Sequence, residues 1–160
     1  MNPIDYPINF IKVIFFKFTF VYNIFNKCCV KIITKIINKK ITIELYDIPP
    51  PEIRGNSRAH YKIMRNINRQ RRETAKFLAL DAMQETGIKT LKPRILVHYH
   101  FYNTREIDLD NLIIGMKCTL DGIVDSGLIE DDSPSKVKLE AEFSLCKKNE
   151  KKTLITLVEI

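Results

Sequence analysis

Four aspartates and one lysine between residues 108 and 132 are the side chains in this sequence best suited to chemistry. Asp108 and Asp110 are one residue apart, Asp131 and Asp132 are adjacent, and Lys117 lies between the two pairs. Two carboxylates about 4 Å apart repel each other by roughly 4 kcal/mol at an effective dielectric constant of about 20. A fold that gathers such groups therefore commonly places a cation between them. In a chain with a formal net charge of +7, this acidic segment indicates metal-assisted chemistry on a phosphate polymer.

The chemistry expected of these residues follows from their types. Carboxylate oxygens are the ligands that Mg²⁺ prefers, and Mn²⁺ is expected to substitute for it. A bound ion would polarise a phosphodiester and help to generate hydroxide from water. Lys117 would neutralise the developing negative charge or orient the attacking water. Asp108 and Asp110 follow a predicted strand, where residues i and i+2 point to the same side, so both are expected to face one ion.

A helix is expected to begin at Asp110 or Asn111 and to end near Gly127. Its periodicity places Lys117 and Asp121 on the same face as Asp110. The opposite side carries the predicted core residues Leu112, Met116, Leu120 and Ile123. Asp131 and Asp132 follow the helix after a short apolar segment. We expect them to fold back toward the helix and to supply a further metal ligand.

Each acidic residue also has a purely structural interpretation. Asp110 can cap a helix, which is worth about 1 kcal/mol. The segment Asp131-Asp132-Ser133-Pro134 can be a polar turn. Lys117 and Asp121 can form a surface ion pair of about 0.3–0.5 kcal/mol. The segment would have no chemical role only if all of these structural interpretations were correct at once.

A second chemical pattern is a stripe of basic residues at helical spacing. A long helix is expected from a Ser57 N-cap to about Gln84, with Gly87 ending it. Spacings of 3 and 4 place six basic residues on one face, with Arg54 and Arg71 beside them. A solvated face normally mixes both signs, so this stripe favours contact with nucleic-acid phosphates. The stripe consists of Arg58, Lys62, Arg65, Arg69, Arg72 and Lys76.

The elements that must position these residues follow from alternating apolar patterns. Strands are expected at 41–46, at 94–102, from Val137 to Leu145 and from Leu154 to Ile160, with the last two forming a terminal hairpin. Together with the two helices, the order is β-α-β-α-β-β. The predicted fold is a small α+β domain with a mixed sheet and helices packed on it.

Residues 1–40 differ from the remainder of the chain. They hold seven lysines and one acid, whereas residues 41–160 hold 19 basic and 18 acidic residues. We expect an accessory or poorly ordered basic and apolar extension, followed by one domain over 41–160. The uncharged runs of the extension are too short for a membrane helix. Four cysteines without a CxxC spacing, beside three histidines, favour reduced thiols in the cytoplasm rather than a zinc site. No chemistry is assigned to His98 and His100.

The order of these motifs resembles a known family. The run Asp108-Leu-Asp110-Asn-Leu, then Lys117, Asp121-Gly and Gly127-Leu-Ile-x-Asp131-Asp132-Ser133, resembles the RusA-type Holliday-junction resolvases common in phages and prophages. The upstream stretch from Pro50-Pro51 to Asn56-Ser57-Arg58-Ala59-His60-Tyr61 resembles the N-terminal signature of the same family. The resemblance covers roughly residues 41–160. One departure is Ile114, which stands where some members have a lysine; Lys117 suits the longer-spaced members. A second is Glu106-Ile107, which separates Arg105 from the first aspartate, where many members have a basic residue.

The resemblance implies a homodimeric, Mg²⁺-dependent endonuclease that makes paired nicks across a four-way DNA junction in recombination and repair. It implies that Asp108, Asp110 and Asp132 are metal ligands assisted by Asp131, and that Lys117 is the catalytic lysine. Asp121 and Asn111 are further candidates. The DNA-binding set expected from the basic stripe and the N-terminal signature is Arg58, His60, Lys62, Arg65, Arg69, Arg72 and Lys76.

Two other functions remain open at this point. One is a branched-DNA-binding module that has lost catalysis or uses ions only for structure. The other is a nuclease for flaps or other DNA structures. Neither alternative requires a membrane.

Overall fold

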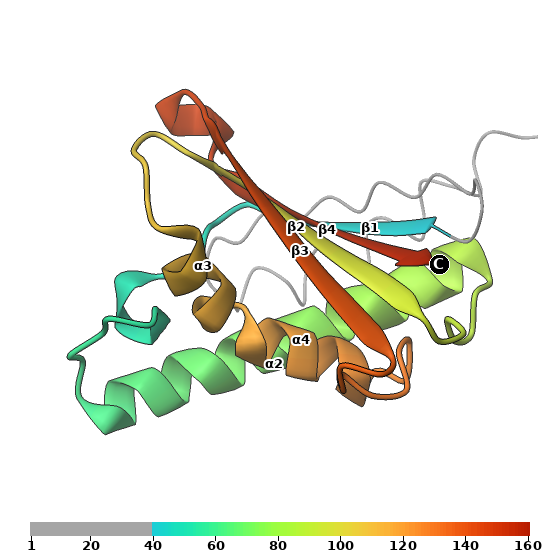
Figure 1. Cartoon of the computed structure of the whole chain (residues 1–160). Helices are drawn as coiled ribbons and strands as arrows, with labels where there is room; N and C mark the ends of the chain where they lie inside the picture. Colours follow the sequence, from blue (N-terminus) through green and yellow to red (C-terminus); the bar gives the residue numbers. More distant parts are fainter. Residues whose placement is uncertain (1–39) are drawn as a thin grey trace, which may run out of the picture.

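The computed structural model describes residues 40–160, so all of the predicted N-terminal extension except Lys40 lies outside the described part (Figure 1). Lys40 is the first residue of strand β1. The elements, in chain order, are β1 (Lys40–Leu45), the short 3-10 helix η1 (Pro51–Ile53), α2 (Tyr61–Thr86), β2 (Ile95–Asn103), α3 (Leu109–Gly115), α4 (Lys117–Asp125), β3 (Val137–Leu145), η2 (Lys148–Glu150) and β4 (Lys152–Glu159).

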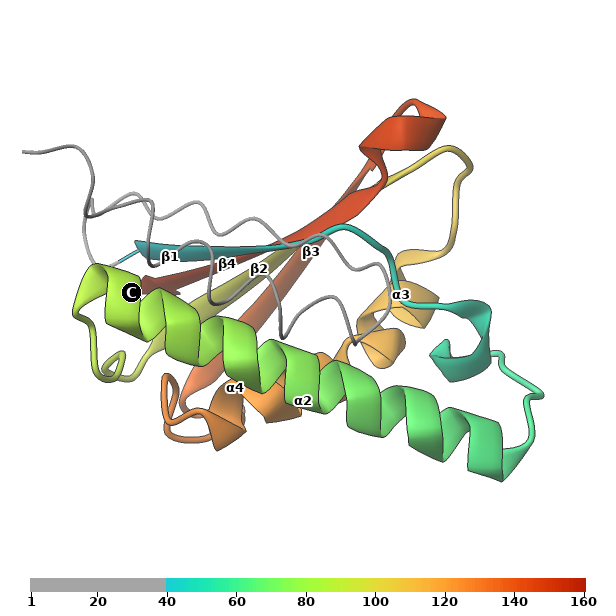
Figure 2. The same ribbon diagram turned by 180° about the vertical axis from the view of Figure 1, so that it is seen from behind.

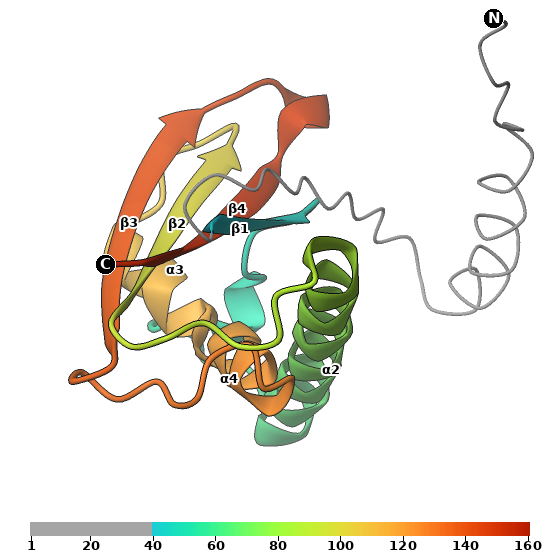
Figure 3. The same cartoon turned by 90° about the vertical axis from the view of Figure 1, so that its right-hand side faces the viewer.

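The predicted α+β class is confirmed. Four strands form one mixed sheet in the order β1-β4-β2-β3, and the helices lie on one face of it (Figures 1 and 3). Strand β3 runs parallel to β2, and the crossover between them contains α3 and α4. Strand β4 is antiparallel to both of its neighbours. This arrangement leaves β1 and β3 at the two edges.

The predicted terminal hairpin is wrong. Strand β4 does not pair with β3; it lies between β1 and β2, so that Ile155 is paired with both Ile43 and Tyr99. Burial accounts for this position, because Ile155 and Leu157 are fully buried, whereas Leu139 and Leu145 of β3 are exposed. The more apolar strand occupies the centre of the sheet, and the more polar one forms its edge.

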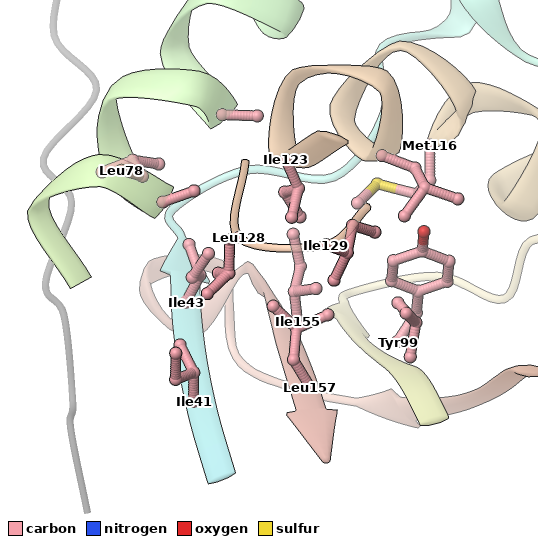
Figure 4. Close-up of a cluster of buried hydrophobic side chains, with 14 of the residues drawn as sticks. Ile41, Ile43, Leu78, Tyr99, Met116, Ile123, Leu128, Ile129, Ile155 and Leu157 are labelled. Atoms are coloured by element: carbon pink, nitrogen blue, oxygen red, sulfur yellow. The ribbon is translucent and has the colours of Figure 1, made fainter. Parts of the chain in front are cut away.

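The core lies between the sheet and the helices (Figure 4). Alternate residues of β1, β2 and β4 point into it, as the period-2 pattern predicts. The predicted helical stripe is also buried, since Leu112, Met116 and Ile123 are fully covered and Leu120 nearly so. Burying each such side chain contributes about 1.5–3 kcal/mol, so this face fixes the orientation of the helices.

Helix α2 begins later than predicted. The N-cap is His60, whose Nδ1 accepts a hydrogen bond from the Lys62 amide at 3.3 Å. Ser57 instead accepts from the Ala59 amide at 3.1 Å, which closes a local turn before the helix. Arg58 therefore precedes the helix rather than lying on it. The predicted stop at Gly87 is confirmed, because this residue has a φ of 70° and its amide bonds to the Met83 carbonyl.

The single helix expected from Asp110 to Gly127 is two helices with a break at Met116. The Met116 amide bonds to the Ile113 carbonyl at 3.0 Å, which tightens the last turn of α3. Gly115 packs against the preceding loop so closely that a Cβ there would lie 2.5 Å from Cβ of Pro49. The break therefore occurs where the chain must pass this loop, and α4 starts afresh at Lys117.

Helices α2 and α4 lie side by side beneath the sheet (Figures 2 and 3). Their contact depends on Gly122, because a Cβ at this position would collide with the Arg72 carbonyl and lie 2.9 Å from Cβ of Ala75. This close packing sets the exposed side of α2 beside the start of α4.

Candidate functional site

Lys117 is the centre of the candidate site. It is the first residue of α4, and its ammonium group lies 2.6 Å from Asp121 Oδ1 and 2.6 Å from Asp132 Oδ2. Asp121 follows one helical turn later, and Asp132 comes from the segment between α4 and β3. The helical phase that predicted the pairing of Lys117 with Asp121 is correct, and Asp132 folds back toward the helix as expected.

The electrostatics of this cluster keep Lys117 charged. The hydrogen bonds that Lys117 donates to the two carboxylates raise its pKa, and the small loss of hydration opposes them only weakly. The lysine side chain is 63% exposed, whereas those of Asp121 and Asp132 are 28% and 29% exposed. Such an ammonium group is accessible to an incoming anion and is not a base at neutral pH.

The other pair of predicted ligands lies at the beginning of α3. Asp108 is the N-cap residue and Asp110 is in the first turn, so the expected extended geometry across these two positions is wrong. Asp110 Oδ1 accepts from the Asn111 amide at 2.7 Å, and Asn111 Nδ2 donates to Asp108 Oδ2 at 3.4 Å. Both acids are exposed and benefit from the positive end of the helix dipole. Asn111 is nearly buried and links them.

Asp131 and Asp132 are adjacent but have different partners. A hydrogen bond with Ser133 lowers the pKa of Asp131, so this carboxylate is held within its own turn. Asp132 turns to Lys117 instead. Within residues 40–160, no three His, Cys, Asp or Glu side chains come together as a group that could hold a metal ion.

The carboxylates near Lys117 nevertheless match, in one respect, the ligands that a hard cation prefers. Asp121 and Asp132 already converge on a single positive charge, the Lys117 ammonium. Mg²⁺ is commonly bound through one or two carboxylates, with water and substrate phosphates completing its shell. The residues that would hold it are therefore Asp132 and Asp121, with Asp108 and Asp110 as the remaining candidates.

A groove adjoins this cluster, between α2 on one side and the loop 53–57 with α3 and α4 on the other. Its volume is about 580 Å³. Lys117 and Asp121 lie in its wall, so the groove leads directly to the candidate site. Its lining residues are Ile53, Arg54, Gly55, Ser57, Met64, Arg65, Asn68, Arg69, Arg72, Ile114, Lys117, Cys118 and Asp121.

Only some residues of the predicted basic stripe lie in the groove. Arg65, Arg69 and Arg72 line the groove, whereas Lys62 and Lys76 do not. Arg72 is held by Asp125 through contacts of 2.5 and 2.8 Å, and this bidentate pairing raises the pKa of Arg72 and lowers that of Asp125. For Arg65 and Arg69, no ion pair is found with any residue in the described range. These two arginines are the ones available to an anion in the groove.

The two arginines expected beside the stripe have different roles. Arg54 lines the groove and donates from Nε to the Pro49 carbonyl at 2.7 Å, which fixes its loop. The predicted DNA-binding set does not include Arg54, although it belongs to the groove; the adjacent Gly55, which marks a tight approach, is the signal in the sequence. Arg71 instead pairs with Asp47 at 2.6 Å and is largely buried, so its role is structural.

A second, smaller hollow of about 300 Å³ lies on the other side of Lys117. It is mostly apolar and is lined by Tyr99, Ile113, Ile114, Lys117, Leu120 and Leu139. Burial raises the pKa of Tyr99, and the negative charges of Asp132 and Asp121 raise it further. The Tyr99 phenol is therefore neutral, and it lines this hollow together with Lys117. Lys117 and Ile114 separate this hollow from the groove.

The strand histidines point away from this site. His98 and His100 lie on the sheet face opposite the core, where His100 Nδ1 is 2.7 Å from Glu142 Oε1 and Nε2 is 2.8 Å from Ser144 Oγ. Burial lowers the pKa of His100, although Glu142 opposes this effect. These contacts join β2 to its parallel neighbour β3.

Comparisons with known proteins add little. No protein-family model and no curated protein matches the chain. Among solved structures, it is similar to the OmpA-like domain of FopA1 from Francisella tularensis subsp. tularensis SCHU S4, with 11% sequence identity, coverage of 84% of each chain and a TM-score of 0.35. A similarity at this TM-score supports no argument about fold or function. In residues 40–160, no helix has the length and apolar character needed to cross a membrane.

Proposed function

We propose that this protein is a Mg²⁺-dependent endonuclease that cleaves branched DNA, as its resemblance to the RusA-type resolvases implies. The observation that carries the proposal is that Lys117 and Asp121, which cluster with Asp132, lie in the wall of a groove lined by arginines. A cation-binding acidic pair beside a phosphate-binding surface is the combination that phosphodiester hydrolysis requires.

Electrostatics support a nucleic-acid substrate. The groove has four arginines and Lys117 in its lining, against the single acid Asp121. This local excess arises in a part of the chain whose overall charge is nearly neutral. Binding would therefore release counterions from the DNA backbone and weaken steeply as the salt concentration rises.

The chain's own residues have distinct roles in this proposal. Asp132 and Asp121 hold a cation, and Asp108 and Asp110 remain the further candidate ligands that the resemblance implies. When bound, Mg²⁺ supplies polarisation of the phosphodiester and an activated water. Lys117, charged and 63% exposed, stabilises negative charge on the phosphate oxygens. Hydrogen bonds to Asp121 and Asp132 raise the pKa of Lys117, which favours its charged form at neutral pH.

The direct test is cleavage of a synthetic four-way junction with Mg²⁺, with Mn²⁺ and with a chelator. We expect paired nicks with either ion and none without. Lys117→Met and Asp110→Asn should each remove most of the activity, whereas Asp81→Asn, an exposed acid on α2, should not. Mg²⁺-dependent cleavage that is unchanged in Asp110→Asn would remove this residue from the site.

Paired nicking also requires two active sites related by symmetry. We therefore propose a homodimer acting on cytoplasmic DNA, in which each subunit cleaves one strand. Sedimentation should give twice the mass of the 18.7 kDa chain. A protein that remains a monomer when bound to a junction would contradict paired cleavage by a dimer.

A second candidate function is a branched-DNA-binding module without catalysis. The observation that favours it is that the predicted metal ligands have different partners within residues 40–160. Asp108 contacts Asn111, Asp131 contacts Ser133 and Asp132 contacts Lys117. It predicts salt-sensitive junction binding and no nicking with any divalent ion. Competition between a junction, a flap and a linear duplex would distinguish both functions from a flap nuclease.

A further inference from the structure

Strand β3 forms one edge of the sheet, with β2 on one side and no strand of residues 40–160 on the other (Figure 3). Two of its apolar side chains are also uncovered, since Leu139 is 46% exposed and Leu145 is 62% exposed. At the opposite edge, Ile41 and Ile43 of β1 are buried. An edge that combines unpaired backbone groups with exposed apolar side chains is a template for pairing with another strand.

The parallel ladder between β2 and β3 determines which backbone groups of β3 are free. The Ile95 amide donates to the Lys136 carbonyl, and the Cys146 amide donates to the Asn103 carbonyl, both at 2.9 Å. The register between these two bonds is continuous, so residues of β3 alternate between bonding to β2 and pointing away from it. The even-numbered residues bond to β2. The odd-numbered residues of 137–145 therefore direct their N–H and C=O groups outward.

The charged side chains of this segment lie on the sheet face opposite the core, and they change sign along the chain. Lys136 and Lys138 come first, and Glu140 and Glu142 follow. A second copy of β3 can pair antiparallel about a two-fold axis at Leu139. In this register, Lys138 faces Glu140 of the partner subunit. Lys136 faces the partner's Glu142, so the charge pattern of the strand is complementary to itself.

This register is selected by both the backbone and the charges. It pairs odd-numbered residues with odd-numbered residues, so the outward N–H and C=O groups of the two strands meet. A shift of the axis by one or two residues in either direction places at least one pair of like charges opposite each other. Opposite charges stabilise a cross-strand pair and like charges destabilise it. The axis at Leu139 is therefore the favoured one.

The same register joins two apolar surfaces on the helix side of the sheet. Leu139 lines the hollow of about 300 Å³ that Ile114 and Lys117 also line. At the axis, Leu139 lies directly opposite Leu139 of the partner subunit, so each side chain covers the other. Ile114, which is 54% exposed, provides further apolar surface in the same hollow. Burial of these side chains adds to the pairing of the charges.

We propose that two copies of this chain pair through the β3 edge, antiparallel about Leu139, and join their sheets into one. The inference rests on the homodimer of the proposed function and specifies its interface and register. The two-fold axis of such a pair is perpendicular to the joined sheet. Because the helices lie on one face of each sheet, both sets of helices cover the same face of the dimer (Figure 3). The two Lys117 clusters then lie on the same side, as paired nicking of one DNA junction requires.

The test exchanges one charge in each of two variants. Lys138→Glu places an acid opposite Glu140 of the partner subunit, and Glu140→Lys places a base opposite the partner's Lys138. Sedimentation equilibrium should show that either variant alone dimerises with a dissociation constant raised about tenfold or more, because the symmetry repeats each repulsion. A mixture of the two variants has opposite charges at both positions and should dimerise about as tightly as the wild type.

The mixture isolates the contact between chains. Within each chain, the 2.8 Å contact between Lys138 and Glu140 stays broken on mixing, so its loss cannot explain a recovery. Lys89→Glu and Asp81→Lys make the same charge changes at exposed positions outside β3. These two variants, alone or mixed, should leave the dissociation constant unchanged.

The apolar contact has its own matched pair of variants. Leu139→Lys places two like charges at the axis and should weaken dimerisation about tenfold. Leu145→Lys changes a more exposed side chain at the end of β3, beyond the residues that pair, and should have a much smaller effect. Thermal unfolding of each variant would verify that it is folded.

The results distinguish this inference from the rest of the proposed function. A wild-type dimer that Lys138→Glu leaves intact, or a mixture that does not recover, would overturn the β3 interface while the homodimer and the nuclease activity stand. A wild-type protein that stays monomeric would overturn the interface and the homodimer together. A dimer with the expected recovery that cleaves no junction confirms the interface and loses only the proposed activity.

Discussion

Two acidic pairs of the described domain, Asp108 with Asp110 and Asp121 with Asp132, differ in what holds them. At the start of α3, Asp110 accepts from the Asn111 backbone amide, and Asp108 accepts from the nearly buried Asn111 side chain. At the start of α4, Asp121 and Asp132 share the exposed ammonium of Lys117. The first pair is bonded within its own helix, whereas the second is held by an exposed ammonium group. Spacing alone therefore does not determine which carboxylates are chemically available.

The largest expected effect separates two adjacent acids. Asp132→Asn should reduce junction cleavage about 10²–10³-fold, because it removes the carboxylate that contacts Lys117 and that we propose as a cation ligand. Asp131→Asn should cost less, since this carboxylate is held by Ser133. Initial rates on a four-way junction with Mg²⁺ would measure both. Equal losses would mean that the two acids act as a pair and that the division between them has no functional meaning.

The next effect concerns the packing that places α4 beside the arginines of α2. Gly122→Ala should lower the free energy of unfolding by about 1–3 kcal/mol, because the added methyl group would collide with the Arg72 carbonyl. Chemical denaturation would measure it. Ser126→Ala, which changes a side chain just beyond the end of the same helix, should cost less. An unchanged stability in Gly122→Ala would show that α2 and α4 can separate without cost.

A smaller effect is expected at the α3 pair. Asn111→Ala should destabilise the protein by about 1–2 kcal/mol, because a nearly buried amide that contacts Asp108 is lost. The exposed Asn66 of α2 provides the control, since Asn66→Ala should change stability by less than about 0.5 kcal/mol. If the two substitutions had the same effect, Asn111 would not be what organises the α3 pair.

The smallest effect is a pH dependence at Lys117. Its pKa is raised above the ordinary 10.5 by Asp121 and Asp132, so the pairing stabilises the fold fully below that value and is lost as pH rises through the folded-state pKa. The stability difference between wild type and Lys117→Met should be under about 1 kcal/mol, since the lysine is exposed. It should stay constant around neutral pH and shrink only in strong alkali. A change near neutral pH would point to a different group.

Much of this arrangement follows from local patterns in the sequence. Period-2 alternation identified β1 and β2 and their buried faces, and the 3.6-residue period identified the core stripe of Leu112, Met116 and Ile123. The pairing of Lys117 with Asp121 follows from the same period. These predictions succeed because neighbouring residues on one element determine them.

The errors share a different cause, since each depends on contacts between distant segments. The break at Met116 reflects the approach of Pro49 to Gly115, which no helical pattern reveals. The position of β4 depends on competition between strands for the centre of the sheet. The division of the basic stripe depends on Asp125 reaching Arg72 from another helix. A sequence pattern shows which residues can pair, but not which partner the fold selects.

The central position of β4 has a consequence for the order in which the domain can assemble. Among residues 40–160, strand β1 pairs only with β4, so Ile43 cannot form its ladder until Ile155 is present. During synthesis, α2 and the β2–α3–α4–β3 unit can begin to organise while β1 still lacks a neighbour. The sheet closes only when β4 emerges and inserts between strands that are already present. Strand pairing between residues so far apart in the sequence slows folding. The complete sheet, and with it the single domain, forms only when β4 is added.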